Sequence, residues 1–97
     1  MIVIDYRPDG FTMTGHAGFA EYGEDIVCAG ISALVQTLVE AVEELTDDEL
    51  QYEISAGYVD VKHEALTERA QVLFDAFLIG VEMIAESYPD NVELCKH

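Results

Sequence analysis

Residues 26–45 read IVCAGISALVQTLVEAVEEL, and apolar side chains recur in this stretch every three or four positions. That spacing places one apolar face along a helix of about five turns. The apolar set is Ile26, Val27, Ile31, Leu34, Val35, Leu38, Ala41, Val42 and Leu45. We expect Asp25 to be the N-cap, because its carboxylate can accept a hydrogen bond from an unpaired amide near Cys28. The run Thr46-Asp47-Asp48 ends the helix.

Two pairs of segments with alternating apolar and polar residues lie before and after this helix. They are residues 2–6 and 11–14 around the turn Pro8-Asp9-Gly10, then residues 51–55 and 58–62 around Ala56-Gly57. Alternation of this kind is typical of strands, and the turn residues suit tight connections. The sequence therefore predicts one hairpin before the helix and a second hairpin after it.

A second helix follows Thr67, which can cap it, and Tyr88-Pro89-Asp90 stops it. Its apolar set is Ala70, Leu73, Phe74, Phe77, Leu78, Val81, Ile84 and Ala85. Residues 91–95 alternate again and can add a short last strand. The order ββαββα, with this closing strand, predicts an α+β fold of two layers, in which two helices cover one face of an antiparallel sheet. We expect residues 1–97 to form one domain, and a homodimer, because strand residues on both faces are apolar.

The chain has 97 residues and a formal net charge of −16. Phosphate backbones would be repelled, so we exclude nucleic acid as a partner; an acidic surface favours encounter with a basic protein or serves solubility alone. Glu, Gln, Ser or Asp interrupt the apolar runs before the ~20 residues of a membrane span, so we expect no membrane partner. No secretory leader is visible at the N-terminus, so we expect a cytoplasmic protein with reduced thiols.

His16 and Cys28 are the residues best placed for chemistry. The expected hairpin ends at Gly15-His16-Ala17-Gly18, and Cys28 falls in the first turn of the expected helix, so both lie at the same end of the sheet. Unpaired amides and the macrodipole at a helix N-terminus favour a thiolate, and an imidazole can accept and return its proton. The same amides can bind an oxyanion. This pattern predicts a cysteine nucleophile with a histidine base.

Neighbouring residues bear on this site in different ways. An ionised Asp25 would disfavour a thiolate by repulsion, unless capping the helix or orienting His16 offsets that effect. Ser32 lies one turn after Cys28 and can hydrogen-bond within the site, although a buried, locally satisfied hydroxyl is the commoner role. The three glycines in residues 15–23 predict a loop without regular structure.

Other interpretations of these residues stay open. A cysteine at an apolar helix start often packs as a small core residue, and a histidine after glycine often bonds locally in a turn. A zinc site from His16, Cys28, His63 and Cys95 would lack the usual close ligand pairs, so we expect no metal. We expect His63 and His97 at the surface and Cys95 in an edge strand without a chemical role.

The run GHAGFAEYGEDIVCAGISAL at residues 15–34 resembles the signature of the ribosomal-processing cysteine protease family, Prp. The resemblance implies that His16 and Cys28 form the catalytic dyad, and Gly15, Asp25 and Ser32 match further motif positions. Glu24 and Gly30 depart from the lysine and alanine that are common there, and neither belongs to the dyad.

The resemblance also implies an activity. Members of that family are cytoplasmic homodimers without a cofactor that remove a short N-terminal extension from a basic large-subunit ribosomal protein, and prophage versions act on capsid or scaffold proteins. Their loop corresponding to residues 17–24 reshapes on substrate binding, so we expect Gly18 and Gly23 to permit movement and Phe19 and Tyr22 to contact substrate. The alternative is a noncatalytic acidic protein that binds a basic ribosomal protein.

Overall fold

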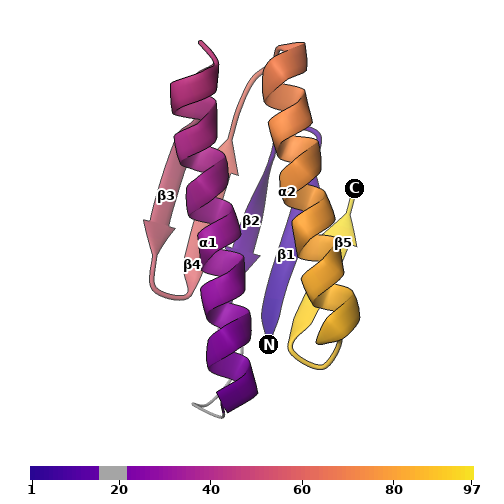
Figure 1. Cartoon of the computed structure of the whole chain (residues 1–97). Helices are drawn as coiled ribbons and strands as arrows, with labels where there is room; N and C mark the ends of the chain where they lie inside the picture. Colours follow the sequence, from indigo (N-terminus) through magenta and orange to yellow (C-terminus); the bar gives the residue numbers. More distant parts are fainter. Residues whose placement is uncertain (16–21) are drawn as a thin grey trace.

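The computed structural model describes residues 1–15 and 22–97, with the backbone alone for residues 22–25. The elements are β1 Ile2–Arg7, β2 Gly10–Thr14, α1 Tyr22–Leu45, β3 Gln51–Ser55, β4 Tyr58–Lys62, α2 Glu68–Ser87 and β5 Val92–Lys96. Both helices lie side by side on one face of the sheet (Figure 1). This arrangement confirms the α+β fold of two layers and the short last strand.

The strand order across the sheet is β3-β4-β2-β1-β5. β1 with β2, β2 with β4 and β3 with β4 are antiparallel, but β5 is parallel to β1, from Ile2 opposite Val92 to Tyr6 opposite Lys96. The predicted antiparallel sheet is therefore confirmed for β1 to β4, and the last strand departs from it. The reason is that α2 returns the chain to the end of the sheet where β1 begins, and the amide of Ile2 donates to the carbonyl of Asn91 over 2.8 Å.

The core fills the space between the sheet and the helices. Its largest fully buried side chains are Phe11, Phe74, Ile4, Ile31, Val27, Val35, Val42, Val61 and Val81. Phe11 of β2 stacks on Phe77 of α2, with 4.8 Å between the ring centroids. Burial of this apolar surface stabilises the packing of helices on sheet, at roughly 25 cal/mol per Å². The apolar spacing of both helices correctly predicted their buried faces, although Ile26 and Leu45 at the ends of the first set are exposed.

α1 begins at Tyr22, one turn earlier than its apolar pattern predicts. Asp25 therefore lies inside the helix and is not its N-cap, and Cys28 lies in the second turn. Tyr22 and Gly23, expected in the loop, are helical. The sequence hides this extra turn because residues 22–25 show no apolar repeat and Gly23 is a poor helix former.

Residues Ile26–Leu45 of α1 have the length and apolarity of a membrane-spanning helix, with a mean hydropathy of 1.6. Ser32, Gln36 and Glu40 interrupt this run, as expected, but its length and average apolarity still reach those of a span. Core helices meet the same criterion. In this fold one face of α1 packs on the sheet through residues such as Val27, Ile31 and Val35.

The second helix begins and ends where the sequence predicts. Thr67 is its N-cap, and the hydroxyl of Thr67 accepts a hydrogen bond from the amide of Ala70 over 3.3 Å. The same hydroxyl donates to Oδ1 of Asp48 over 2.6 Å. This pair of bonds ties the start of α2 to the segment that follows α1.

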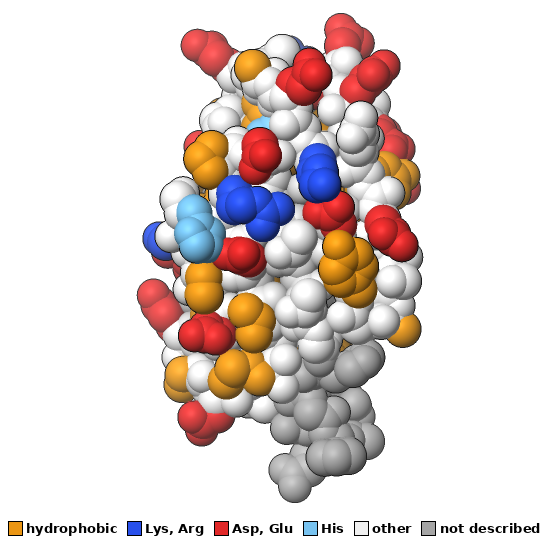
Figure 2. Space-filling model, turned by 180° about the vertical axis from the view of Figure 1, so that it is seen from behind, with side chains coloured by type: hydrophobic (Ala, Val, Ile, Leu, Met, Phe, Trp, Pro, Cys, Tyr) orange, Lys and Arg blue, Asp and Glu red, His pale blue; other side chains and the backbone are white. Residues whose placement is uncertain are grey.

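The sheet face opposite the helices is largely polar. It carries Asp5, Arg7, Thr12, Asp60 and Lys62, and the Arg7 guanidinium lies 3.6 Å from Oδ2 of Asp5. Figure 2 shows basic side chains gathered among acidic ones on this side of the molecule. The expectation of apolar residues on both sheet faces holds only in part, so the homodimer stays a prediction.

Candidate active site

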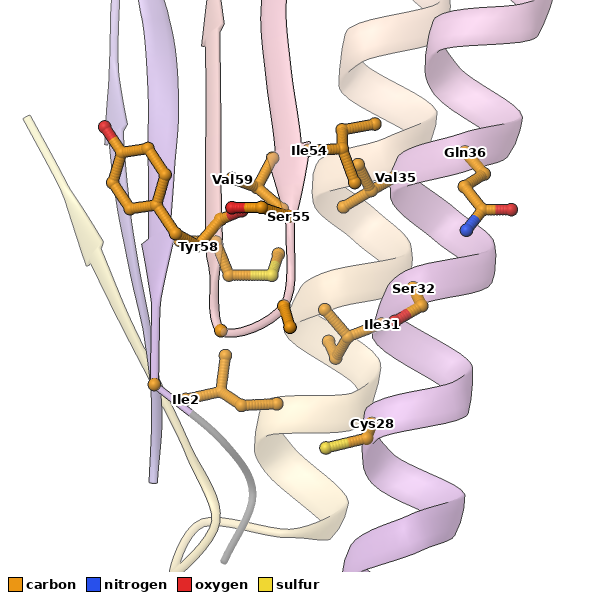
Figure 3. A pocket seen from close by; sticks show the side chains of 14 residues that line it. Ile2, Cys28, Ile31, Ser32, Val35, Gln36, Ile54, Ser55, Tyr58 and Val59 are labelled. Atoms are coloured by element: carbon orange, nitrogen blue, oxygen red, sulfur yellow. The ribbon is translucent and has the colours of Figure 1, made fainter.

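A groove of about 280 Å³ separates the first half of α1 from the β3–β4 hairpin (Figure 3). It is lined by Ile2, Met13, Gly15, Cys28, Ile31, Ser32, Val35, Gln36, Ile54, Ser55, Ala56, Gly57, Tyr58 and Val59. Most of these side chains are apolar, and the groove's polar side chains include Ser32, Gln36 and the thiol of Cys28. A groove of this kind suits a peptide with apolar side chains.

Cys28 extends from α1 into this groove, and its sulfur points toward Ile2 (Figure 3). The side chain is half-buried and packs against the hydrophobic core. Neither Cys28 nor Cys95 is in a disulfide. Cys28 thus packs as a small core residue on one side, and its other side faces the groove.

Gly15 fixes the start of the segment that carries His16. The amide of Gly15 donates to the carbonyl of Gly57 over 3.0 Å, and its φ is +93°. His16, Gly18 and Phe19 lie outside the described residues, so the distance from the imidazole to Cys28 is not described. His16 nevertheless follows directly on a residue that lines the groove.

Ser32 and Gln36 follow Cys28 along the same side of α1 and line the groove with it. Ser32 is exposed, so its expected role as a buried hydroxyl is wrong. Gln36 was missed by the sequence analysis. The spacing of four residues between 28, 32 and 36 is the signal that could have revealed it, because such residues share a helix face.

The longer α1 changes the electrostatic argument for Cys28. In a helix that begins at Tyr22, the amide of residue 28 points to the carbonyl of residue 24 and is not one of the unpaired amides of the first turn. The macrodipole acts chiefly within that first turn. The expectation that helix N-terminal amides stabilise the thiolate or bind an oxyanion beside Cys28 is therefore wrong.

Three of the four residues considered for a zinc site, Cys28, His63 and Cys95, lie among the described residues. Among residues 1–15 and 26–97, whose side chains the structure describes, no three His, Cys, Asp or Glu side chains lie close enough together to hold a metal ion. His63 is only half exposed and packs edge-on against Phe74, with 4.8 Å between the ring centroids. His97 is exposed, as expected, and bonds to the carboxylate of Asp5.

Comparison with known proteins identifies the family. Residues 1–93 match the family described as cysteine protease Prp. The chain belongs to the Prp family. This Prp protein is 38% identical over 91 residues to the ribosomal processing cysteine protease Prp of Bacillus subtilis strain 168, covering 87% of this chain and 81% of the relative. It is 34% identical over 85 residues to the Prp of Staphylococcus aureus strain Mu50, covering 84% and 80% of the two chains.

Solved structures agree with the sequence relatives. The S. aureus ribosomal processing protease Prp with a covalently linked product peptide superposes with a TM-score of 0.91 at 29% identity, over the whole of both chains. SMU.848 from Streptococcus mutans superposes with a TM-score of 0.79 at 37% identity, over 98% and 90% of the two chains. This Prp protein is therefore a cysteine protease, which is a hydrolase.

A cysteine protease requires one reactive cysteine, and this Prp protein has two. Cys28 lines the groove between α1 and the β3–β4 hairpin. Cys95 lies on β5, the opposite edge strand of the sheet from β3, as the alternating pattern predicted. Among the described residues, the two cysteines thus differ in their surroundings: Cys28 lines a groove formed by strand, turn and helix residues, and Cys95 lies on an edge strand at the other side of the sheet.

Proposed function

We propose that this chain is a cytoplasmic endopeptidase that removes a short N-terminal extension from a basic ribosomal protein, with Cys28 as its nucleophile. The observation that carries the proposal is the position of the Cys28 thiol in a largely apolar groove of a Prp cysteine protease. Relatives named ribosomal processing protease support the class of substrate. The formal net charge of −16 suits a basic substrate protein.

In the proposed reaction, His16 accepts the thiol proton and the sulfur of Cys28 attacks the carbonyl carbon of the scissile bond. The tetrahedral adduct collapses, the C–N bond breaks, and the imidazolium gives its proton to the leaving amine. A water molecule, deprotonated by His16, then hydrolyses the thioester and releases the new carboxyl end. When the C–S bond of the thioester breaks, the imidazolium returns its proton to the sulfur, so the complete cycle restores the thiol and the imidazole.

The assignment of His16 as the base is supported by its place in the chain. It follows Gly15, a groove residue. The other two histidines have different partners: the ring of His63 lies against Phe74, and His97 bonds to Asp5. Asp25 and Ser32 are proposed to support the dyad.

The remaining residues singled out by the motif are proposed to serve the substrate. Gly18, Phe19, Tyr22 and Gly23 would contact the peptide or let the segment adjust to it. We also keep the homodimer as a proposal, since a chain of this size can gain stability by association.

The test is to incubate the chain with the N-terminally extended ribosomal protein of its host and to determine the product masses. A shortened protein with a new N-terminus is expected. Cys28→Ala should give no product, whereas Cys95→Ala, the matched change at the other cysteine, should cleave like the wild type. Salt-sensitive binding without any cleavage by the wild type would instead favour the noncatalytic alternative.

A further inference from the structure

β3 is an edge strand of the sheet (Figure 1), and its residues Ile54 and Ser55 line the groove. All five residues of β3 are exposed. Tyr52 and Ile54 point to the helix side, because they lie opposite Val61 and Val59, yet they remain 47% and 43% exposed. Edge strands normally carry lysine, proline or a covering element that blocks pairing with another chain. β3 has no lysine or proline.

The hydrogen-bonding phase of the hairpin shows which backbone groups of β3 face outward. The two-residue turn Ala56-Gly57 closes on the pair Ser55 and Tyr58, and such a pair is hydrogen-bonded. The amide of Gly15, next to β2, donates to the carbonyl of Gly57, so this carbonyl faces β2. The backbone groups of the next residue, Tyr58, then face β3, which gives the same alternation. Because the pattern alternates, the N–H and C=O groups of Tyr52 and Ile54 point away from β4, to the outside.

We propose that an extended segment of the protein substrate adds to β3 as a sixth strand, with its main chain bonded to Tyr52 and Ile54. The inference rests on the proposed function, because it assigns the segment's path to the cleavage site. Ile54 lines the same groove as Cys28 (Figure 3), so a strand added to β3 places alternate side chains in that groove. The edge supplies main-chain affinity, and the groove supplies side-chain selection.

Helix geometry gives the register of this segment. Ile54 lies beside Val35 across the groove (Figure 3), and Cys28 precedes Val35 by seven positions. Seven helical residues rise about 10 Å, a length that about three extended residues cover. The substrate residue paired with Ile54 therefore lies about three residues from the scissile bond. The residue paired with Tyr52 lies about five residues away, since Tyr52 and Ile54 are two positions apart.

Charge favours a basic substrate over a second copy of this chain as the occupant. Each copy carries a formal charge of −16, and Glu53 lies in the middle of β3. Two β3 edges brought together would place these like charges opposite one another. A basic extended segment meets no such repulsion.

Amide hydrogen exchange by NMR on the inactive Cys28→Ala variant tests the proposal. The probe is a synthetic peptide that spans the extension and the first mature residues of the host ribosomal protein. At saturation, exchange at Tyr52 and Ile54 should slow on the order of ten-fold or more. Leu94 and Lys96 of β5 are the internal control. The amide of His97 donates to the carbonyl of Tyr6 on β1, and backbone groups alternate in direction along a strand, so the amides of Leu94 and Lys96 point outward. The exchange rates of these two amides should not change.

Kinetics of Ile54→Pro give a second test. Proline removes the outward N–H of Ile54 and breaks no bond to β4, so kcat/KM for the ribosomal protein should fall about ten-fold. Lys96→Pro makes the matched change at the other sheet edge and should leave kcat/KM unchanged. The far-ultraviolet circular dichroism spectra of both variants should match that of the wild type.

The possible failures can be told apart. A wild-type chain that does not cleave the ribosomal protein overturns the proposed function together with the added strand. Cleavage by the wild type, combined with bound peptide that leaves the Tyr52 and Ile54 amides unprotected, overturns only the added strand. An Ile54→Pro variant that keeps the wild-type kcat/KM also overturns only the added strand.

Discussion

Gly15 connects β2 to the segment that carries His16, and its conformation excludes a side chain. Its φ is +93°, and an added Cβ would lie 2.3 Å from the carbonyl oxygen of Met1. We expect Gly15→Ala to destabilise the fold by roughly 1–3 kcal/mol and to lower cleavage, because the backbone must shift where the segment that carries His16 begins. Urea denaturation measures the first effect and product formation the second.

Gly30→Ala is the matched control for that change. Gly30 lies within α1, and an added Cβ would meet Cδ1 of Ile84, at 3.2 Å. The end of a flexible side chain can move, and alanine favours a helix by about 1 kcal/mol over glycine, so the net change should be small. Equal losses of stability in the two variants would contradict the argument from the Gly15 backbone.

His16→Ala should lower kcat/KM by about 10²-fold or more, because general acid–base catalysis contributes about 10²–10⁴-fold. The far-ultraviolet circular dichroism spectrum should stay like that of the wild type. His97→Ala is the control, since it removes an exposed histidine whose partner is Asp5 on β1. Ordinary cleavage rates in His16→Ala would require another base.

At this scale the sequence singled out a cysteine that lines a groove but misjudged its surroundings. Cys28 was predicted from its place at the start of an apolar helix, and it lines the groove. The roles of Asp25 as N-cap and of Ser32 as a buried hydroxyl were wrong, because both depended on the first residue of α1 and on which neighbours cover it. Helix termini leave weaker traces in a sequence than buried helix faces do.

Among the elements, the N-terminus of α2 has a hydrogen-bonded cap that links it to the end of α1. The amide and the hydroxyl of Thr67 both donate to the carboxylate of Asp48, over 2.9 and 2.6 Å. These bonds hold the pKa of Asp48 below its ordinary value of 3.8. The cap and the carboxylate thus depend on each other.

Thr67→Ala should destabilise the fold by about 1 kcal/mol near neutral pH through loss of the cap. A carboxyl with a lowered pKa stabilises the fold fully above its unfolded pKa, and this contribution is lost as the pH falls through the folded pKa. The difference between wild type and variant should therefore shrink as the pH falls below about 4. Urea denaturation from about pH 7 to pH 2 measures it.

Thr67→Ser keeps the hydroxyl and is the control, so it should retain most of the stability and the wild-type pH dependence. A difference between Thr67→Ala and the wild type that is the same at every pH would show that Asp48 takes no part.

The elements themselves were predictable to different degrees. Both hairpins and α2 could be read from local pattern, because turn residues and apolar spacing lie within each segment. The parallel pairing of β5 with β1 could not, since it joins residues some 90 positions apart, such as Ile2 and Val92. The alternation of apolar and polar residues in a strand does not indicate which other strand it pairs with.

Considered as a whole, the molecule uses its few basic side chains internally. Arg7 lies near Asp5 and Asp9, Lys62 near Asp60, and Lys96 near Glu82. The guanidinium of Arg69 donates to the carbonyl of Leu45 at the end of α1. Exposed pairs of this kind add little stability. Because these basic side chains are already paired within the molecule, the remaining acidic side chains determine the electrostatic field that an approaching substrate meets.

That field predicts the salt dependence of cleavage. For the basic ribosomal substrate, kcat/KM should fall on the order of ten-fold between about 20 and 300 mM salt, because screening weakens long-range attraction. The control is the same protein with lysines and arginines distant from the cleavage site changed to glutamine, for which the dependence should weaken. Alkylation of Cys28 by neutral iodoacetamide should hardly respond to salt, whereas anionic iodoacetate should react faster as salt rises. A salt-independent kcat/KM would mean that the negative charge of −16 serves solubility and does not attract substrate.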